Sequence, residues 1–91
     1  MSKSVEPFAV IRNDREYVIA DPDAPLATGC PVVVKIAMGD RPRWFEGVLA
    51  TKRPNKAKTL DVDLDNGFRE RRILPENVVR VIGLYARKLL A

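Results

Sequence analysis

The chain has no histidine and a single cysteine, Cys30, among its 91 residues. One thiol cannot form an internal disulfide, and metal sites built from cysteine and histidine are excluded. With no histidine available as its base, Cys30 is expected to be a small buried apolar residue rather than a reactive thiol. We therefore expect no metal and no cofactor.

Long apolar runs are also lacking. No segment approaches the ~18–20 apolar residues that a membrane-spanning helix needs, and residues 1–7 lack the apolar core of a signal peptide. A lone cysteine fits a reducing compartment. We expect an intracellular location and no membrane partner, without distinguishing cytoplasm, nucleoid or nucleus.

The net charge is +4, from 16 Lys and Arg against 12 Asp and Glu, and it is unevenly distributed. Residues 1–28 carry −2, residues 29–82 carry +4 and residues 83–91 carry +2. This distribution is expected if an anionic partner binds the central segment. An ordinary solvated surface that keeps a small domain soluble remains the alternative.

Residues 1–28 are predicted to form an N-terminal β-hairpin extension and a connector. Residues 8–11 and 17–20 are apolar and rich in β-branched or aromatic side chains, and the Asn13-Asp14 pair between them favours a turn. Two prolines in residues 21–25 interrupt any strand and mark the connector.

In residues 29–82, apolar and polar side chains alternate in short runs, which predicts a β-meander. Gly47 lies inside one run and indicates a bend or a close backbone approach. Asn66-Gly67 predicts a type I′ hairpin turn, and residues 38–43 are rich in turn formers. The expected strands are residues 31–37, buried mainly on one side, and residues 44–52, 59–64, 68–74 and 78–82.

The C-terminal segment begins with a predicted 3₁₀ turn at residues 75–77, before the last strand. Gly83 is expected to end that strand, and residues 84–90 are expected to form a short helical turn. Seven residues are too few for a stable isolated helix, so this tail, residues 83–91, must contact the strands of residues 29–82 or another subunit. A homo-oligomer is therefore one expectation.

Four short motifs resemble the Tudor family, which has a small five-stranded SH3-like barrel. They lie at residues 33–35, 44–48, 65–68 and 73–78. The resemblance covers residues 30–82 and implies a mainly β domain at residues 29–82. Chromo-barrel, PWWP, KOW and retroviral-integrase C-terminal domains share parts of these motifs.

The Tudor resemblance implies a reader of methylated lysine or arginine peptides with an aromatic cage, in which each ring contributes roughly 0.5–2 kcal/mol of cation–π attraction. Phe45 and Phe68 match two walls, and Trp44 or Asp40 could swing in from the neighbouring loop. Asn66 stands where the family has an acidic group, so the cage is incomplete. Alternatively, the N-terminal hairpin covers Trp44 and Phe45, and both belong to the core.

A second interpretation uses the basic residues, with Trp44 and Phe68 as a stacking platform. Cations follow phosphates while an aromatic ring stacks on a base, which indicates DNA or RNA binding with weak sequence preference. Solvated strand edges are the structural alternative. The nine candidates are Arg41, Arg43, Lys52, Arg53, Lys56, Lys58, Arg69, Arg71 and Arg72.

The acidic residues Asp61, Asp63 and Asp65 alternate along one predicted strand. No glycine-containing calcium loop accompanies them, so pairing with neighbouring Arg or Lys is expected. No nucleophile–base arrangement is visible and no enzymatic activity is expected. The sequence favours a binding module for nucleic acid, with a peptide reader and a protein–protein assembly module as alternatives.

Overall fold

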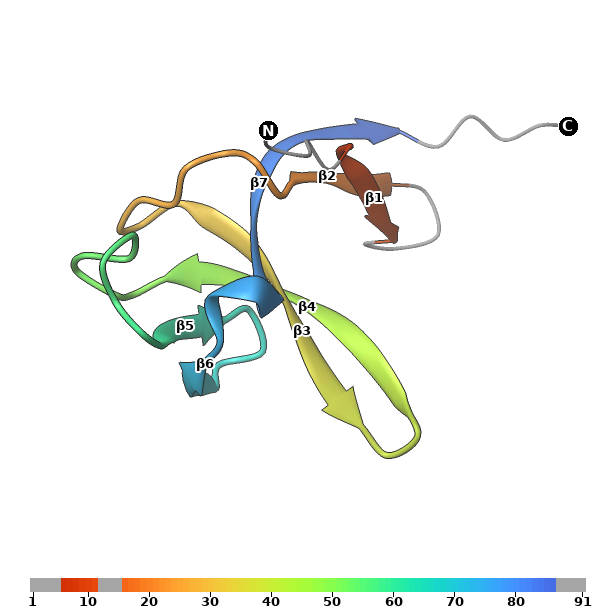
Figure 1. Ribbon diagram of the computed structural model, residues 1–91. Helices are drawn as coiled ribbons and strands as arrows, with labels where there is room; N and C mark the ends of the chain where they lie inside the picture. The colour runs from red at the N-terminus through yellow and green to blue at the C-terminus, as the bar shows by residue number, and fades with distance from the viewer. Residues whose placement is uncertain (1–5, 12–15, 87–91) are drawn as a thin grey trace, which may run out of the picture.

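Seven antiparallel strands form one sheet in the computed structural model, which describes residues 6–11 and 16–86 (Figure 1). Their order across the sheet is β1-β2-β7-β3-β4-β5-β6. The mainly β prediction is confirmed, but β1 and β6 are the two edges of an open sheet, so a closed barrel is not confirmed. The elements are β1 (Phe8–Ile11), β2 (Glu16–Asp21), β3 (Pro31–Met38), β4 (Arg41–Leu49), β5 (Leu60–Leu64), β6 (Arg69–Ile73), the 3₁₀ helix η1 (Pro75–Asn77) and β7 (Val78–Ala86).

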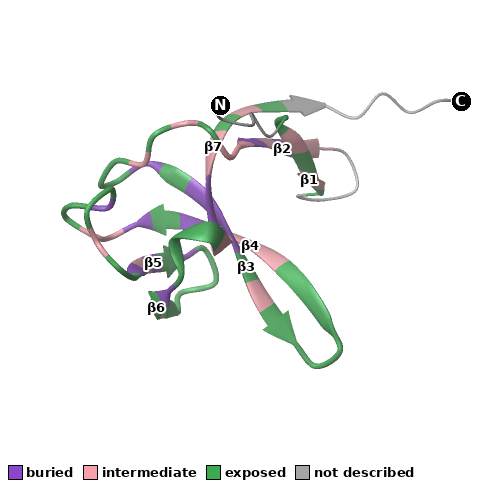
Figure 2. Cartoon of the chain, viewed as in Figure 1, coloured by how far each residue is buried: buried purple, intermediate pink, exposed green. Residues whose placement is uncertain are grey.

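The core consists of two apolar clusters on opposite faces of β3. Val32 and Val34 belong to the first cluster, with Leu49, Leu60 and residues of β5 to β7. Val33 belongs to the second, and all three valines are fully buried. The expectation that this strand is buried mainly on one side is therefore wrong. Figure 2 shows buried segments where β3 and β7 cross and further ones on β4, β5 and β6.

The N-terminal hairpin covers the face of β3 that carries Val33. β1 and β2 pair as predicted, with Phe8 opposite Ala20, and β2 then pairs with β7. Val18 and Ala20 are fully buried in the second cluster. The hairpin thus shares one sheet and one core with the central segment.

The β3–β4 hairpin is much longer than the sequence indicated. The two strands pair from Pro31 opposite Val48 to Met38 opposite Arg41, which leaves only Gly39 and Asp40 in the turn. Gly39 has a φ of 62°, the conformation that a type II′ turn requires at its first central position. The predicted loop over residues 38–43 is therefore wrong, because one positive-φ glycine suffices to reverse the chain.

Gly47 confirms the predicted close approach. A Cβ atom there would lie 2.6 Å from the backbone oxygen of Asp63 and 2.8 Å from Cγ1 of Val62. No larger residue fits without displacing β5.

The β5–β6 turn lies where Asn66-Gly67 predicts it, but its type differs. Gly67 has a φ of 93°, whereas Asn66 keeps a negative φ. The Gly67 N–H donates to the Leu64 oxygen (3.1 Å) and the Leu64 N–H to the Phe68 oxygen (2.7 Å). These bonds define a three-residue loop, in which a type I turn is followed by one left-handed residue, and not the predicted type I′ turn.

The C-terminal strand also departs from expectation. The 3₁₀ turn at Pro75–Asn77 is confirmed, but β7 continues through Gly83 to Ala86 because β2 pairs with it beyond a bulge. The predicted helical turn is wrong over residues 84–86, and its remainder lies outside the described residues. No helix within residues 6–11 and 16–86 is long and apolar enough to cross a membrane.

Candidate nucleic-acid interface and aromatic pocket

The loop between β4 and β5 carries the densest positive charge in the sequence. Lys52, Arg53, Lys56 and Lys58 lie within seven residues, and residues 51–59 contain no acidic side chain. All four are exposed. In the part of the chain that the structure describes, none of them takes part in an ion pair. Their positive potential is therefore not cancelled locally.

This basic loop (residues 51–59) is held by the connector that precedes β3. The Thr28 hydroxyl donates to the backbone oxygens of Thr51 (2.6 Å) and Lys52 (3.0 Å). The Asn55 amide donates to the Leu26 oxygen (3.0 Å), and Pro54 within the loop is buried. The backbone is fixed at several points while the cations face solvent, so binding an anion there requires little ordering of the main chain.

Two further predicted cations, Arg71 and Arg72, lie on β6 beside the base of this loop. Asp61 connects the two segments. Its N–H donates to the Thr51 hydroxyl (2.8 Å), and its carboxylate accepts from the Arg72 N–H (3.2 Å). The pairing of β5 with β6 is irregular here, between Leu60 and Val62. Arg72 has a φ of 58°, in the left-handed region that residues other than glycine seldom adopt.

Arg69 differs from the other basic candidates because it is already paired. Its guanidinium donates to both carboxylate oxygens of Asp63, with Nη2 3.0 Å from Oδ2. The hydrogen bond and charge of Arg69 lower the pKa of Asp63, and Asp63 raises the pKa of Arg69. Both side chains are about half exposed (50% for Asp63 and 47% for Arg69). Pairing of these strand charges was expected from the sequence.

Arg41 and Arg43 lie near the turn of the β3–β4 hairpin, at the opposite end of β4 from the basic loop (Figure 1). The structure therefore separates the nine basic candidates into two regions. The first region surrounds the β4–β5 loop and contains Lys52, Arg53, Lys56, Lys58, Arg71 and Arg72, with Arg69 further along β6. Arg41 and Arg43 form the second region.

The three aromatic candidates lie in different surroundings. Trp44 packs on the second core cluster, with its ring 5.3 Å from that of Phe8. Phe45 is partly buried against the first cluster, whereas Phe68 is 70% exposed. The N-terminal hairpin covers Trp44 in part, so this ring belongs partly to the core and partly to the surface.

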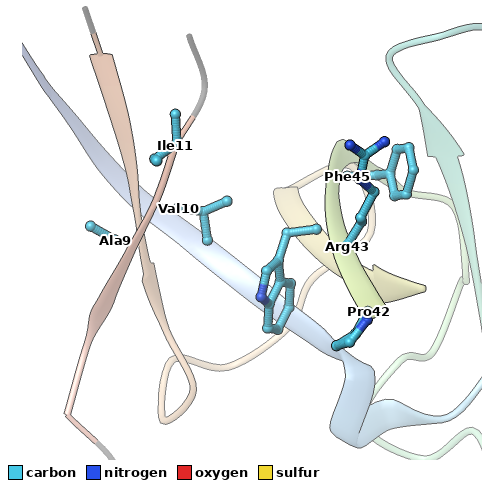
Figure 3. A pocket seen from close by; sticks show the side chains of 7 residues that line it. Ala9, Val10, Ile11, Pro42, Arg43 and Phe45 are labelled. Carbon is cyan, nitrogen blue, oxygen red and sulfur yellow. The ribbon is translucent and has the colours of Figure 1, made fainter. Parts of the chain in front are cut away.

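A groove runs between β1 and the outer part of β4 (Figure 3). The residues that line it come from β1 (Ala9, Val10 and Ile11) and from β4 (Pro42, Arg43, Trp44 and Phe45).

The groove continues into an adjoining pocket of about 210 Å³. This pocket brings together three of the four predicted cage residues, namely Trp44, Phe45 and Asn66, and leaves Phe68 outside its lining. Asp65 and Glu46 also line it. The sequence comparison with the Tudor cage missed these two carboxylates because it considered only Asp40 and the position of Asn66. Alternation along β4, which places Glu46 on the same face as Trp44, was the available signal.

No group of three or more Cys, Asp or Glu residues in the described segments is arranged to hold a metal ion. Cys30 is buried as predicted and is 6% exposed.

Comparisons with protein-family models, with curated proteins and with solved structures give no match. The Tudor resemblance thus stays a prediction from the short motifs.

Proposed function

We propose that this chain is a non-catalytic nucleic-acid-binding module with weak sequence preference. The observation that carries the proposal is the basic loop, in which four exposed cations stand on a backbone fixed by Thr28 and Asn55. Arg71 and Arg72 extend this surface onto β6. Phosphate contacts of this kind bind DNA or RNA but read no sequence directly.

We also infer that β3 to β7 form an SH3-like unit of Tudor type. Three observations support this finer assignment. The five strands neighbour each other in the order β7-β3-β4-β5-β6, η1 immediately precedes the last of them, and their interior faces share one apolar cluster.

The salt dependence of binding tests the nucleic-acid proposal. Fluorescence anisotropy with labelled single-stranded and duplex oligonucleotides should show affinity falling steeply between 50 and 200 mM salt, which are typical test concentrations. Lys56→Gln should reduce the slope of log affinity against log salt by about 0.7–0.9, the value of one phosphate contact. Arg69→Gln is the control, since it removes one charge that already has a partner. Affinity that does not change with salt would contradict the proposal.

The aromatic pocket favours a second candidate function, the binding of a methylated cationic side chain. Trp44 and Phe45 supply aromatic surface, and Asp65 supplies the negative charge that Asn66 lacks. NMR titration with a trimethyllysine peptide and its unmodified counterpart should shift the Trp44 and Asp65 signals only with the former. Asp65→Asn should weaken that binding. Absence of shifts at millimolar peptide would exclude this candidate.

A further inference from the structure

The outer half of the β3–β4 hairpin projects from the body as a two-stranded ribbon. β7 pairs with β3 only at residues 32–34, and β5 pairs with β4 only at residues 47–49. Residues 35–38 and 41–44, here called the ribbon, pair only with each other among the described residues. Figures 1 and 2 show this ribbon extending away from the other strands, with an exposed outer end.

The ribbon is basic as well as exposed. Lys35, Arg41 and Arg43 are exposed and Asp40 is the only acidic residue in residues 35–43, which gives the segment a charge of +2. Met38, at its end, is 49% exposed. An isolated apolar ribbon would favour aggregation, whereas these charges suit a polyanionic partner.

The pairing register assigns these side chains to faces. Ile36 lies opposite Arg43 and Met38 opposite Arg41, so the two arginines share one face with two apolar side chains. Lys35 lies on the other face, opposite Trp44. Cations therefore point from both faces of the ribbon, and one face presents a regular pair of guanidinium groups.

We propose that this ribbon enters the major groove of duplex DNA, which deepens the nucleic-acid function proposed above and rests on it. The groove is about 12 Å wide and 8.5 Å deep and accepts a two-stranded β-ribbon. Four residues per strand give a ribbon roughly 10–13 Å long, which lies along the groove and spans three to four base-pair steps.

The spacing of the two arginines also fits. Arg41 and Arg43 are two residues apart on one strand, or about 6.6 Å. Successive nucleotides along a DNA strand are about 3.4 Å apart along the axis, so two steps span nearly the same distance. Arginine pairs bidentately with the N7 and O6 acceptors of guanine in the major groove. The two side chains can thus contact base edges two steps apart.

The ribbon distinguishes duplex DNA from duplex RNA. The major groove of A-form RNA is deep and too narrow for side chains to read. Binding through the ribbon should therefore favour the DNA duplex, whereas the basic loop contacts phosphates in either nucleic acid.

The experiment uses the full chain and three labelled probes of one sequence: a 20-base-pair DNA duplex, the corresponding RNA duplex and the single DNA strand. Arg41→Gln/Arg43→Gln is compared with Lys52→Gln/Lys56→Gln, which removes the same charge from the basic loop. The ribbon variant should weaken binding to the DNA duplex about tenfold or more, and binding to the other probes less than about threefold. The loop variant should weaken all three. All four replaced residues are exposed, and a denaturation curve for each variant confirms that it folds.

Dimethyl sulfate footprinting, which reports the accessibility of guanine N7, gives a second readout. The wild-type chain should protect guanines of the DNA duplex, and the ribbon variant should leave them reactive. Equal weakening of all three probes by the ribbon variant, or unprotected N7 atoms in the wild-type complex, would overturn the ribbon proposal. The proposed function survives that result if the loop variant still weakens binding, and both fail if the wild-type chain binds none of the probes.

Discussion

At the scale of single residues, position 47 requires glycine because the neighbouring strand leaves no space for a side chain. Gly47→Ala would force Cβ to within 2.6 Å of a backbone oxygen of β5, which cannot rotate away. We expect a loss of about 1–3 kcal/mol in the free energy of unfolding, measured by chemical denaturation. Gly83→Ala is the matched control, since its Cβ would have no neighbour within 4 Å. Equal effects of the two substitutions would contradict this account.

Arg72 is the residue at which the backbone is strained. A left-handed conformation costs an L-residue roughly 1–2 kcal/mol, which glycine avoids, while glycine adds about 0.5–1 kcal/mol of unfolded-state entropy. Arg72→Gly should therefore stabilise the fold slightly, by up to ~1 kcal/mol. Arg71→Gly removes the same charge from the neighbouring position without relieving a positive φ, and should destabilise. If both variants change the unfolding free energy in the same direction, strain at Arg72 is not the cause.

The Asp63–Arg69 pair makes the free energy of unfolding depend on pH in the acidic range. Because Arg69 lowers the pKa of Asp63 from its usual 3.8, the ionised carboxylate stabilises the folded state above that value. This contribution is lost as the pH falls through the lower, folded-state pKa. Arg69→Gln should raise the Asp63 pKa toward 3.8, as followed by the carboxyl carbon shift in an NMR titration. Arg71→Gln should leave it unchanged, and a similar pKa in both variants would exclude the pairing.

At the scale of elements, a ring contact between β1 and β4 adds to the β2–β7 pairing that holds the N-terminal hairpin. Phe8 and Trp44 pack at 5.3 Å between ring centroids with planes inclined by 48°. A double-mutant cycle with Phe8→Ala and Trp44→Ala should give a coupling energy of about 0.5–1.5 kcal/mol. Phe68→Ala should cost less than ~0.5 kcal/mol, because that ring is 70% exposed. A coupling energy of zero would show that the hairpin is not held by this ring pair.

The elements also show what sequence patterns convey. Alternation located the strands of the first core cluster, because one buried face produces a period of two. It misjudged β3, since Val33 is buried by a hairpin more than a dozen residues earlier in the chain. It ended the last strand at Gly83, because the pairing with β2 that continues β7 is a long-range contact.

The candidate site was predictable only where its residues are close in sequence. The basic loop is visible as a run of cations, and the structure adds the hydrogen bonds from Thr28 and Asn55 that fix it. The aromatic pocket combines β1, β4 and the β5–β6 turn. No local pattern indicates that Val10 and Asp65 meet across it, because their proximity depends on how the sheet curls.

At the scale of the whole molecule, the two core clusters make the N-terminal hairpin part of the fold. Removing residues 1–21 would expose Val33 and Val79, both otherwise buried, and leave the edge of β7 without a partner. We expect the truncated chain to lose cooperative unfolding and to associate, because a free edge beside apolar surface favours aggregation. Denaturation and sedimentation measure these two effects.

Two substitutions in the full chain separate loss of the hairpin core from loss of chain length. Val18→Asp places a charge in the second cluster, where Val18 is fully buried, and should reproduce the effect of truncation. Ile11→Asp lies on the same hairpin but is 66% exposed, so it should unfold at nearly the wild-type denaturant concentration. A monomeric truncated chain that unfolds like the wild type would mean that the first cluster suffices for folding. The hairpin would then serve mainly to form the groove against β4.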